Sequence, residues 1–237
     1  MPAVFVHGVP DTAAMWTPLL AELARDDVIT LSLPGFGTPV PAGFGATKDE
    51  YAEWVAERVA EIDEPVDLVG HDWGSLLTQR VALTRPELLR SFVMSDGAVA
   101  DNFTWHDLAL QWQTPGTGEQ IMELMTGDAI VLALRDADHP DPEGAATAID
   151  DTMKSCTLSL YRSAIDIVGA WVPQGRAARP GLVLWGANDP YGPPAYGERI
   201  AEAMGAELVV LDAGHWAPAQ RPRETVAALE AFWADIP

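Results

Sequence analysis

Residues 68–75 read Leu68-Val69-Gly70-His71-Asp72-Trp73-Gly74-Ser75. An apolar strand here ends in a small-x-acid-x-small turn, a pattern that lifts its central side chain, Asp72, off the strand into a cleft. Glycines at 70 and 74 leave room for so sharp a turn. A carboxylate is ionised at neutral pH and can attack saturated carbon that bears a leaving group, as in epoxides and alkyl halides. The alternative is an ordinary turn in which Asp72 caps the next helix.

Three further segments could supply partners for Asp72. Residues 4–10, Val-Phe-Val-His-Gly-Val-Pro, end a strand in a turn that can aim the amide of Val9 at the cleft. A strand near 181–186 leads to Asp189, and another near 207–211 leads to His215. The chain order is therefore nucleophile, acid, histidine. Two other acids, Asp96 and Asp212, remain alternatives to Asp189 as the partner of His215.

Together, these motifs resemble the α/β-hydrolase superfamily, in its aspartate-nucleophile branch of epoxide hydrolases and haloalkane dehalogenases. The likeness spans nearly the whole chain, being strong at the motifs and weak in the middle. It implies that Asp72 is the nucleophile, that His215 activates water and that Asp189 orients His215. Backbone amides of Val9 and Trp73 would form the oxyanion hole. The resembling segments are His7-Gly8-Val9-Pro10 with Trp16, residues 70–74, Asn188-Asp189 and Gly214-His215-Trp216.

The composition fits one enzyme domain that acts on small molecules. The chain has 237 residues, is 48% hydrophobic and carries a formal charge of −21 from 14 basic and 35 acidic residues. That charge disfavours nucleic acid and anionic membranes as partners and leaves neutral or cationic substrates open. The partners we expect are water and a small neutral hydrophobic substrate. The single cysteine, Cys156, excludes an intramolecular disulfide. No secretory signal or bilayer-spanning run is evident, which predicts a cytoplasmic protein, and neither a cofactor nor a metal is expected.

Strand-like and helical runs alternate along most of the chain, which is typical of an α/β fold with a mainly parallel sheet. About six strands are predicted, near 3–6, 27–33, 66–70, 90–95, 181–186 and 207–211. The flanking helices are predicted near 16–25, 48–62, 74–84, 193–204 and 221–235.

Residues 101–178 break this alternation. They contain helical stretches near 105–113, 118–125 and 147–167, a polar loop at 136–144 and no convincing strand. By the resemblance, this block is a helical cap over an α/β-hydrolase core formed by residues 1–100 and 179–237.

The beginning of the chain departs from the resembling fold, which normally opens with two antiparallel strands. Here the first strand already starts at residue 3, so the strand near 27–33 should become an edge of the sheet. Because unprotected edges invite pairing, we expect a homodimer contact or a covering segment there, or else a trimmed chain.

The group that leaves the substrate separates the two activities. A departing halide needs two N–H donors, whereas an epoxide oxygen needs a proton. By the resemblance, Trp73 matches one halide donor of the dehalogenases, and also occurs in the epoxide hydrolases. The other donor is an asparagine at the position of Val9, or a cap tryptophan such as Trp105, Trp112 or Trp171.

The segment Leu158-Ser159-Leu160-Tyr161-Arg162 resembles the epoxide-hydrolase stretch in which a tyrosine points its hydroxyl at the epoxide oxygen. A phenol can bind that oxygen and then protonate it. The alternative is a tyrosine whose ring packs while its hydroxyl faces solvent. The family's other cap tyrosine would fall at Leu108 and is missing, so Trp105 or Trp112 could replace it as a donor. Other nearby polar residues could contact substrate or face water: Asn102, His106 and Gln111.

Three functions follow as hypotheses. Epoxide hydrolysis leads, on the evidence of Tyr161-Arg162, valine at position 9 and Gly214-His215-Trp216. Haloalkane dehalogenation is second, favoured by nine tryptophans and by Leu108. A small-molecule-binding or tailoring protein without turnover is third, motivated by the missing strands and the missing cap tyrosine. The intact triad argues against it.

Overall fold

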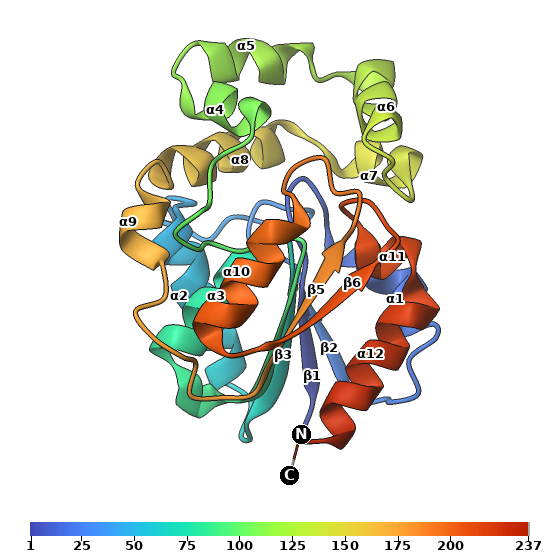
Figure 1. The fold of residues 1–237 in the computed structure, drawn as a ribbon. Helices are drawn as coiled ribbons and strands as arrows, with labels where there is room; N and C mark the ends of the chain where they lie inside the picture. Colours follow the sequence, from blue (N-terminus) through green and yellow to red (C-terminus); the bar gives the residue numbers. More distant parts are fainter. Residues whose placement is uncertain (237) are drawn as a thin grey trace.

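A single sheet of six parallel strands forms the centre of the computed structural model, which describes residues 1–236 (Figure 1). The strand order is β2-β1-β3-β4-β5-β6, with β2 and β6 at the edges. This confirms the predicted fold class. Each strand begins and ends within a few residues of its expected position: β1 Ala3–Val6, β2 Val28–Leu31, β3 Val66–His71, β4 Leu89–Ser95, β5 Gly181–Gly186 and β6 Glu207–Leu211.

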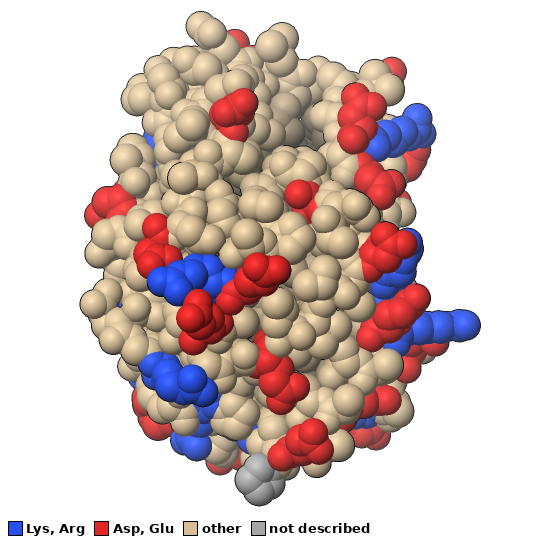
Figure 2. Space-filling model, viewed as in Figure 1, with Lys and Arg blue, Asp and Glu red and all other residues tan. Residues whose placement is uncertain are grey.

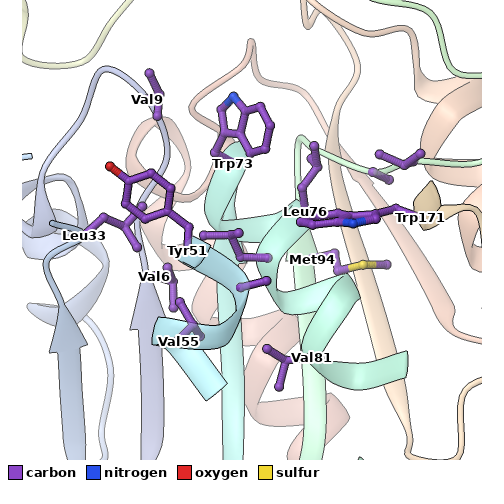
Figure 3. Close-up of a cluster of buried hydrophobic side chains, with 14 of the residues drawn as sticks. Val6, Val9, Leu33, Tyr51, Val55, Trp73, Leu76, Val81, Met94 and Trp171 are labelled. Carbon is purple, nitrogen blue, oxygen red and sulfur yellow. The ribbon is translucent and has the colours of Figure 1, made fainter. Parts of the chain in front are cut away.

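Helices cover both faces of the sheet because successive residues of each buried strand point to opposite sides. On β3, Leu68 packs into the apolar cluster beneath α2 and α3, whereas Val69 packs toward α1 and α12. Figure 3 shows part of the first cluster, with Val55 and Val81 between helices and sheet. One face carries α2 (Lys48–Ala60), α3 (Trp73–Thr84) and α10 (Pro194–Met204), and the other carries α1 (Thr17–Leu20), α11 (Ala217–Gln220) and α12 (Pro222–Ala234).

The helix predicted near 16–25 is shorter in the structure than expected. A 3-10 turn at Ala13–Trp16 leads into α1, which ends at Leu20. The chain then turns so that Arg25 can pair with Asp27 and with the buried carboxylate of Asp67 on β3. Asp67 has no exposed side-chain area and is also paired with Arg90, so Arg25 joins the segment after α1 to a buried ion-pair cluster on β3.

Six helices between β4 and β5 form an insertion, most of which lies over one end of the sheet (Figure 1). The insertion also contacts the core: the amide of Lys48 in α2 donates to Ser163 Oγ at 2.7 Å. A second bond joins Trp171 Nε1 to Asp49 Oδ1 at 3.2 Å. The helices are α4 (Asp107–Gln113), α5 (Thr117–Leu124), α6 (Gly127–Asp136), α7 (Pro142–Ala148), α8 (Asp151–Ser163) and α9 (Ile167–Trp171).

Two details of the insertion differ from expectation. Helix α6 was not predicted, although its buried Ile130 and Leu134 have helical spacing. The residues of the helix expected over 147–167 belong to three helices, α7, α8 and α9: α7 starts inside the polar loop, α9 starts at Ile167 and α8 starts at Asp151. A new start occurs there because the Asp150 carboxylate accepts a hydrogen bond from the Met153 amide, as an N-cap does.

Charge is unevenly distributed over the face drawn in Figure 2: acidic side chains are frequent on the lower part of the molecule and sparse over α4 and α5, whereas acidic and basic side chains lie side by side over α6 and α7. Within residues 1–236, no helix is both long and apolar enough to cross a bilayer.

The edge position of β2 makes a testable prediction about its backbone amides. Because β2 pairs only with β1, we expect faster deuterium exchange in Val28–Leu31 than in Val66–His71, which is paired on both sides. Mass spectrometry at two protein concentrations measures the exchange of both strands. Exchange that slows at high concentration would indicate a homodimer through β2. Slow exchange in a demonstrated monomer would contradict the prediction.

Candidate active site

Asp72 stands at the sharp turn between β3 and α3. Its backbone has φ 51° and ψ −119°, a positive-φ conformation uncommon outside glycine. Its amide donates to the Ser95 carbonyl at 2.9 Å, which fixes the turn against β4. A Cβ on Gly70 would collide with the carbonyl of Gly74, and one on Gly74 would collide with that of Val6. Both glycines are therefore required by close backbone approach, as predicted.

The Asp72 carboxylate lies between an amide donor and a histidine. The Val9 amide donates to Oδ1 at 2.7 Å, and His215 Nε2 lies 3.6 Å from Oδ2. Burial would raise the pKa of Asp72, but interactions with His215 and the Val9 amide outweigh it and hold that pKa below its ordinary value. Trp73 opens α3, so its amide has no partner inside the helix. Figure 3 shows Val9 and Trp73 at the same end of the sheet.

His215 is held by a second carboxylate on its other side. Its Nδ1 lies 2.9 Å from Asp189 Oδ2, and Asp189 Oδ1 accepts a 2.8 Å bond from the Tyr191 amide. When the ring is neutral, this contact fixes its proton on Nδ1, and Nε2 faces Asp72. Burial would lower the pKa of His215, but the charges of Asp189 and Asp72 raise it well above its ordinary value.

The structure distinguishes among the three acids considered as partners of His215. Asp96 accepts bonds of 2.6 Å from the Gly186 amide and from Ser95 Oγ. Burial and the neighbouring Asp189 raise the pKa of Asp96 to about 8. Asp212 instead accepts from the Asn188 side chain at 3.2 Å. Within residues 1–236, Asp189 is the acid that hydrogen-bonds His215 Nδ1.

A cavity of about 580 Å³, including its mouth, opens over these groups. A neighbouring hollow of about 430 Å³ shares five residues with it, Asp72, His106, Tyr161, Tyr191 and His215. The remaining wall of the cavity is mainly apolar and is formed by Val9, Pro10, Leu108, Trp112, Met125, Ile130, Ala133, Leu134, Ala137 and Trp216. Trp73 and Trp105 line the neighbouring hollow.

Tyr161 on α8 belongs to the cavity wall and not to the outer surface. Its side chain is buried among three indole rings, with centroids 5.4 Å from Trp73, 5.3 Å from Trp105 and 4.9 Å from Trp112. Burial and the negative charge of Asp72 raise the pKa of Tyr161 well above its ordinary value. The phenol therefore stays protonated at neutral pH and can donate.

The tryptophans considered as cap donors differ in availability. Trp105 Nε1 donates to the Ala164 carbonyl at 3.2 Å, and Trp171 Nε1 is bonded to Asp49. Trp112 Nε1 is buried and has no partner within residues 1–236. Leu108 lines the cavity at the position where the resemblance expects a tyrosine.

Of the three polar residues near Leu108, only His106 lines the cavity. Its Nδ1 accepts from the Ala109 amide at 3.2 Å, so the neutral ring carries its proton on Nε2. Burial lowers the pKa of His106. Asn102 instead bonds the Ala195 carbonyl, and Gln111 is exposed.

Sequence reasoning missed two parts of the wall. Tyr191 lies with its ring centroid 4.8 Å from that of His215, and its place two residues after Asp189 could have suggested it. Ile130 and Leu134 come from the unpredicted helix α6, where their spacing was the available signal. No group of three or more His, Cys, Asp or Glu side chains within residues 1–236 could hold a metal ion.

Comparison with known proteins agrees with this fold. Residues 3–229 match the model of the alpha/beta hydrolase family, and the chain therefore belongs to that family. It is 23% identical to an (E)-2-((N-methylformamido)methylene)succinate hydrolase of Acinetobacter baylyi, over all of this chain and 91% of the relative. A pimeloyl-[acyl-carrier protein] methyl ester esterase of Neisseria meningitidis serogroup C is 27% identical, over 94% and 90% of the two chains.

Solved structures show the same fold. A mutant of a candidate epoxide hydrolase from Pseudomonas aeruginosa superposes with a TM-score of 0.77 at 22% identity, over 98% of this chain and 88% of the other. A loop variant of a haloalkane dehalogenase from Bradyrhizobium elkanii gives 0.76 at 19% identity, over 98% and 90%.

Proposed function

We propose that this hydrolase opens epoxides to diols through an ester formed on Asp72. The observation that carries the proposal is an ionised carboxylate at the turn, with Tyr161, a protonated phenol, in the same cavity. Saturated carbon suits a carboxylate nucleophile, and a phenol suits the oxygen that leaves. In this proposal residues 101–178 act as a cap on a core of residues 1–100 and 179–237, and the mainly apolar wall favours a small neutral hydrophobic substrate.

In the first half-reaction, Asp72 Oδ2 attacks an epoxide carbon while the Val9 amide holds Oδ1. A carbon–oxygen bond forms to Asp72 as the ring carbon–oxygen bond breaks, and the ring oxygen keeps the electron pair. Tyr161 binds this developing alkoxide and gives it a proton. His106 Nε2–H is a second hydrogen-bond donor on the same wall and compensates for the leucine at position 108.

In the second half-reaction, the ester is hydrolysed. Esterification cancels the charge of Asp72, one of the two carboxylates that raise the pKa of His215. The imidazole, still oriented by Asp189, then takes a proton from a water molecule that attacks the Asp72 carbonyl carbon. The amides of Val9 and Trp73 receive the oxyanion, and one such donor is typically worth about 2.7–4 kcal/mol. The departing diol oxygen takes this proton from His215. The second proton of the water, left on the new Asp72 carboxyl group, returns to the Tyr161 phenolate, which restores both side chains.

Haloalkane dehalogenation is the second candidate. It is favoured by Trp73 beside the nucleophile and by the unpartnered Nε1 of Trp112. It is less favoured because the indole N–H groups of Trp105 and Trp171 already donate to other protein groups and are not available to a halide. Valine at position 9 also lacks the side-chain amide that an asparagine there would offer. A binding protein without turnover is disfavoured by the complete Asp72, His215 and Asp189 arrangement.

Ester cleavage, suggested by the names of several relatives, would require a carboxylate to attack a carbonyl and form a mixed anhydride. Three probes therefore test the proposal side by side: styrene oxide, 1,2-dibromoethane and p-nitrophenyl acetate. We expect diol from styrene oxide, no comparable release of bromide or nitrophenolate, and no diol from the Asp72→Ala variant. Bromide release without diol would support haloalkane dehalogenation in place of epoxide opening. Nitrophenolate release alone would contradict a mechanism in which Asp72 is alkylated.

A further inference from the structure

Asp11, a buried carboxylate outside the triad, joins segments that lie far apart in the chain. Its Oδ1 lies 2.9 Å from Nε2 of His139, in the loop between α6 and α7, and its Oδ2 accepts a 2.7 Å bond from Trp216 Nε1. Only 5% of the Asp11 side chain and 3% of that of His139 are exposed. Burying a carboxylate is costly unless it is hydrogen-bonded, and here both oxygens are satisfied.

His139 has a defined orientation in this cluster. The Asp141 amide donates to its Nδ1 at 3.0 Å, so the proton of the neutral ring is on Nε2 and points to Asp11. The ring also packs edge-on against Trp216, with centroids 4.6 Å apart. Since Trp216 directly follows His215, the loop of the insertion is attached beside the catalytic histidine.

A second connection lies on the other side of His215. Gln220 Oε1 accepts from the amide of Gly214 at 2.7 Å, and its Nε2 donates to the carbonyl of Asp138 at 2.7 Å. Gly214 precedes His215, and Asp138 precedes His139. The residues before and after the histidine are therefore each joined to the same short loop, residues 137–141.

Asp11 also belongs to the turn that carries the oxyanion donor. Its amide donates to the Gly8 carbonyl at 3.2 Å, and Val9 lies between the two residues. Asp11 thus connects the insertion loop and the histidine loop through its carboxylate and belongs, through its backbone amide, to the turn of Val9.

We infer that Asp11, His139 and Gln220 are positioning residues that align His215 for ester hydrolysis by holding its loop against residues 137–141. This inference rests on the proposed two-step reaction. Hydrolysis needs Nε2 aimed at a water molecule, and a displacement of about 1 Å can cost on the order of a hundredfold in rate. Alkylation by Asp72 requires no proton transfer to His215, so the connections should act mainly on the second step.

The test compares His139→Phe, which keeps a ring but removes the donor, with Gln220→Leu, which cuts the other connection at a more exposed residue. Glu143→Gln is the control, because it removes the charge that pairs with Arg135 in the same region without touching Asp11. Rapid-quench mass spectrometry with styrene oxide measures alkylation and ester hydrolysis separately. We expect hydrolysis to slow about tenfold in the first two variants, alkylation to change less than threefold, and the control to match wild type.

An equal decrease in the rates of alkylation and ester hydrolysis would overturn the inference. A loss of thermal stability with both rates unchanged would do the same, because either result indicates that the cluster only stabilises the fold. A measurement without substrate tests the positioning of His215 even if the enzyme does not open epoxides. Proton NMR of the His215 Nδ1–H, which faces Asp189, should shift in His139→Phe and Gln220→Leu but not in Glu143→Gln. An unchanged resonance in folded variants also rejects positioning, whereas absence of any alkylated wild type rejects only the proposed reaction.

Discussion

The His215→Gln variant, incubated with styrene oxide, should gain the mass of one substrate molecule and keep it. Asp72 and the Val9 amide remain in place, so alkylation proceeds, but no base at position 215 activates water. Intact-mass spectrometry followed by peptide mapping should locate the added mass on Asp72. Removal of the general base should lower ester hydrolysis by roughly a hundred- to ten-thousandfold, which traps the intermediate.

The double variant His215→Gln, Asp72→Asn is the matched control for this experiment. An amide is a poor nucleophile, so the double variant should keep its unmodified mass. Unmodified protein in His215→Gln itself, with a substrate that wild type turns over, would contradict a covalent intermediate. An adduct mapped to another residue would contradict the role of Asp72.

Tyr161→Phe should lower the turnover of an epoxide by roughly a hundred- to ten-thousandfold, the loss typical of a missing acid catalyst. The expected loss lies in alkylation, since the phenol acts on the oxygen that leaves in that step. Pre-steady-state alkylation with a matched epoxide measures it. Trp73→Phe, which deletes an indole N–H in the same wall, should affect an epoxide less and an alkyl halide more.

Folding must be compared in these variants, because a buried polar group left without its partner costs about 1–3 kcal/mol. Circular dichroism and thermal unfolding provide that comparison. An unchanged alkylation rate in folded Tyr161→Phe would remove this residue from the mechanism and favour dehalogenation or a tryptophan-assisted reaction.

The positions of Asp72, Asp189 and His215 could be predicted because each follows a strand of a parallel sheet. Parallel strands bring their carboxyl ends to one edge, so residues 117 and 143 positions from Asp72 along the chain meet there without any knowledge of side-chain packing. Resemblance and position favour Asp189 over Asp96; strand spacing alone could not separate them, because both acids follow neighbouring strands and differ in which group each carboxylate faces.

The cavity wall could be predicted less well because it depends on how the insertion packs. Local spacing indicated that Tyr161 and Leu108 lie on helices but could not show that His106 faces inward while Gln111 faces out. The bond between Asp11 and His139 joins residues 128 positions apart, and each residue taken alone resembles an ordinary loop residue. Contacts of this kind arise from tertiary packing, for which the sequence offers no periodic signal.

Helix α6 shapes the cavity that receives the substrate but carries none of the residues proposed to react with it. Ile130 and Leu134 face the cavity, whereas Leu132 on the same helix is 57% exposed. None of the three residues belongs to the sheet or to the strand ends that carry Asp72 and His215. Directed evolution restricted to α6 could therefore widen or narrow the range of accepted molecules while sparing the architecture that sustains catalysis.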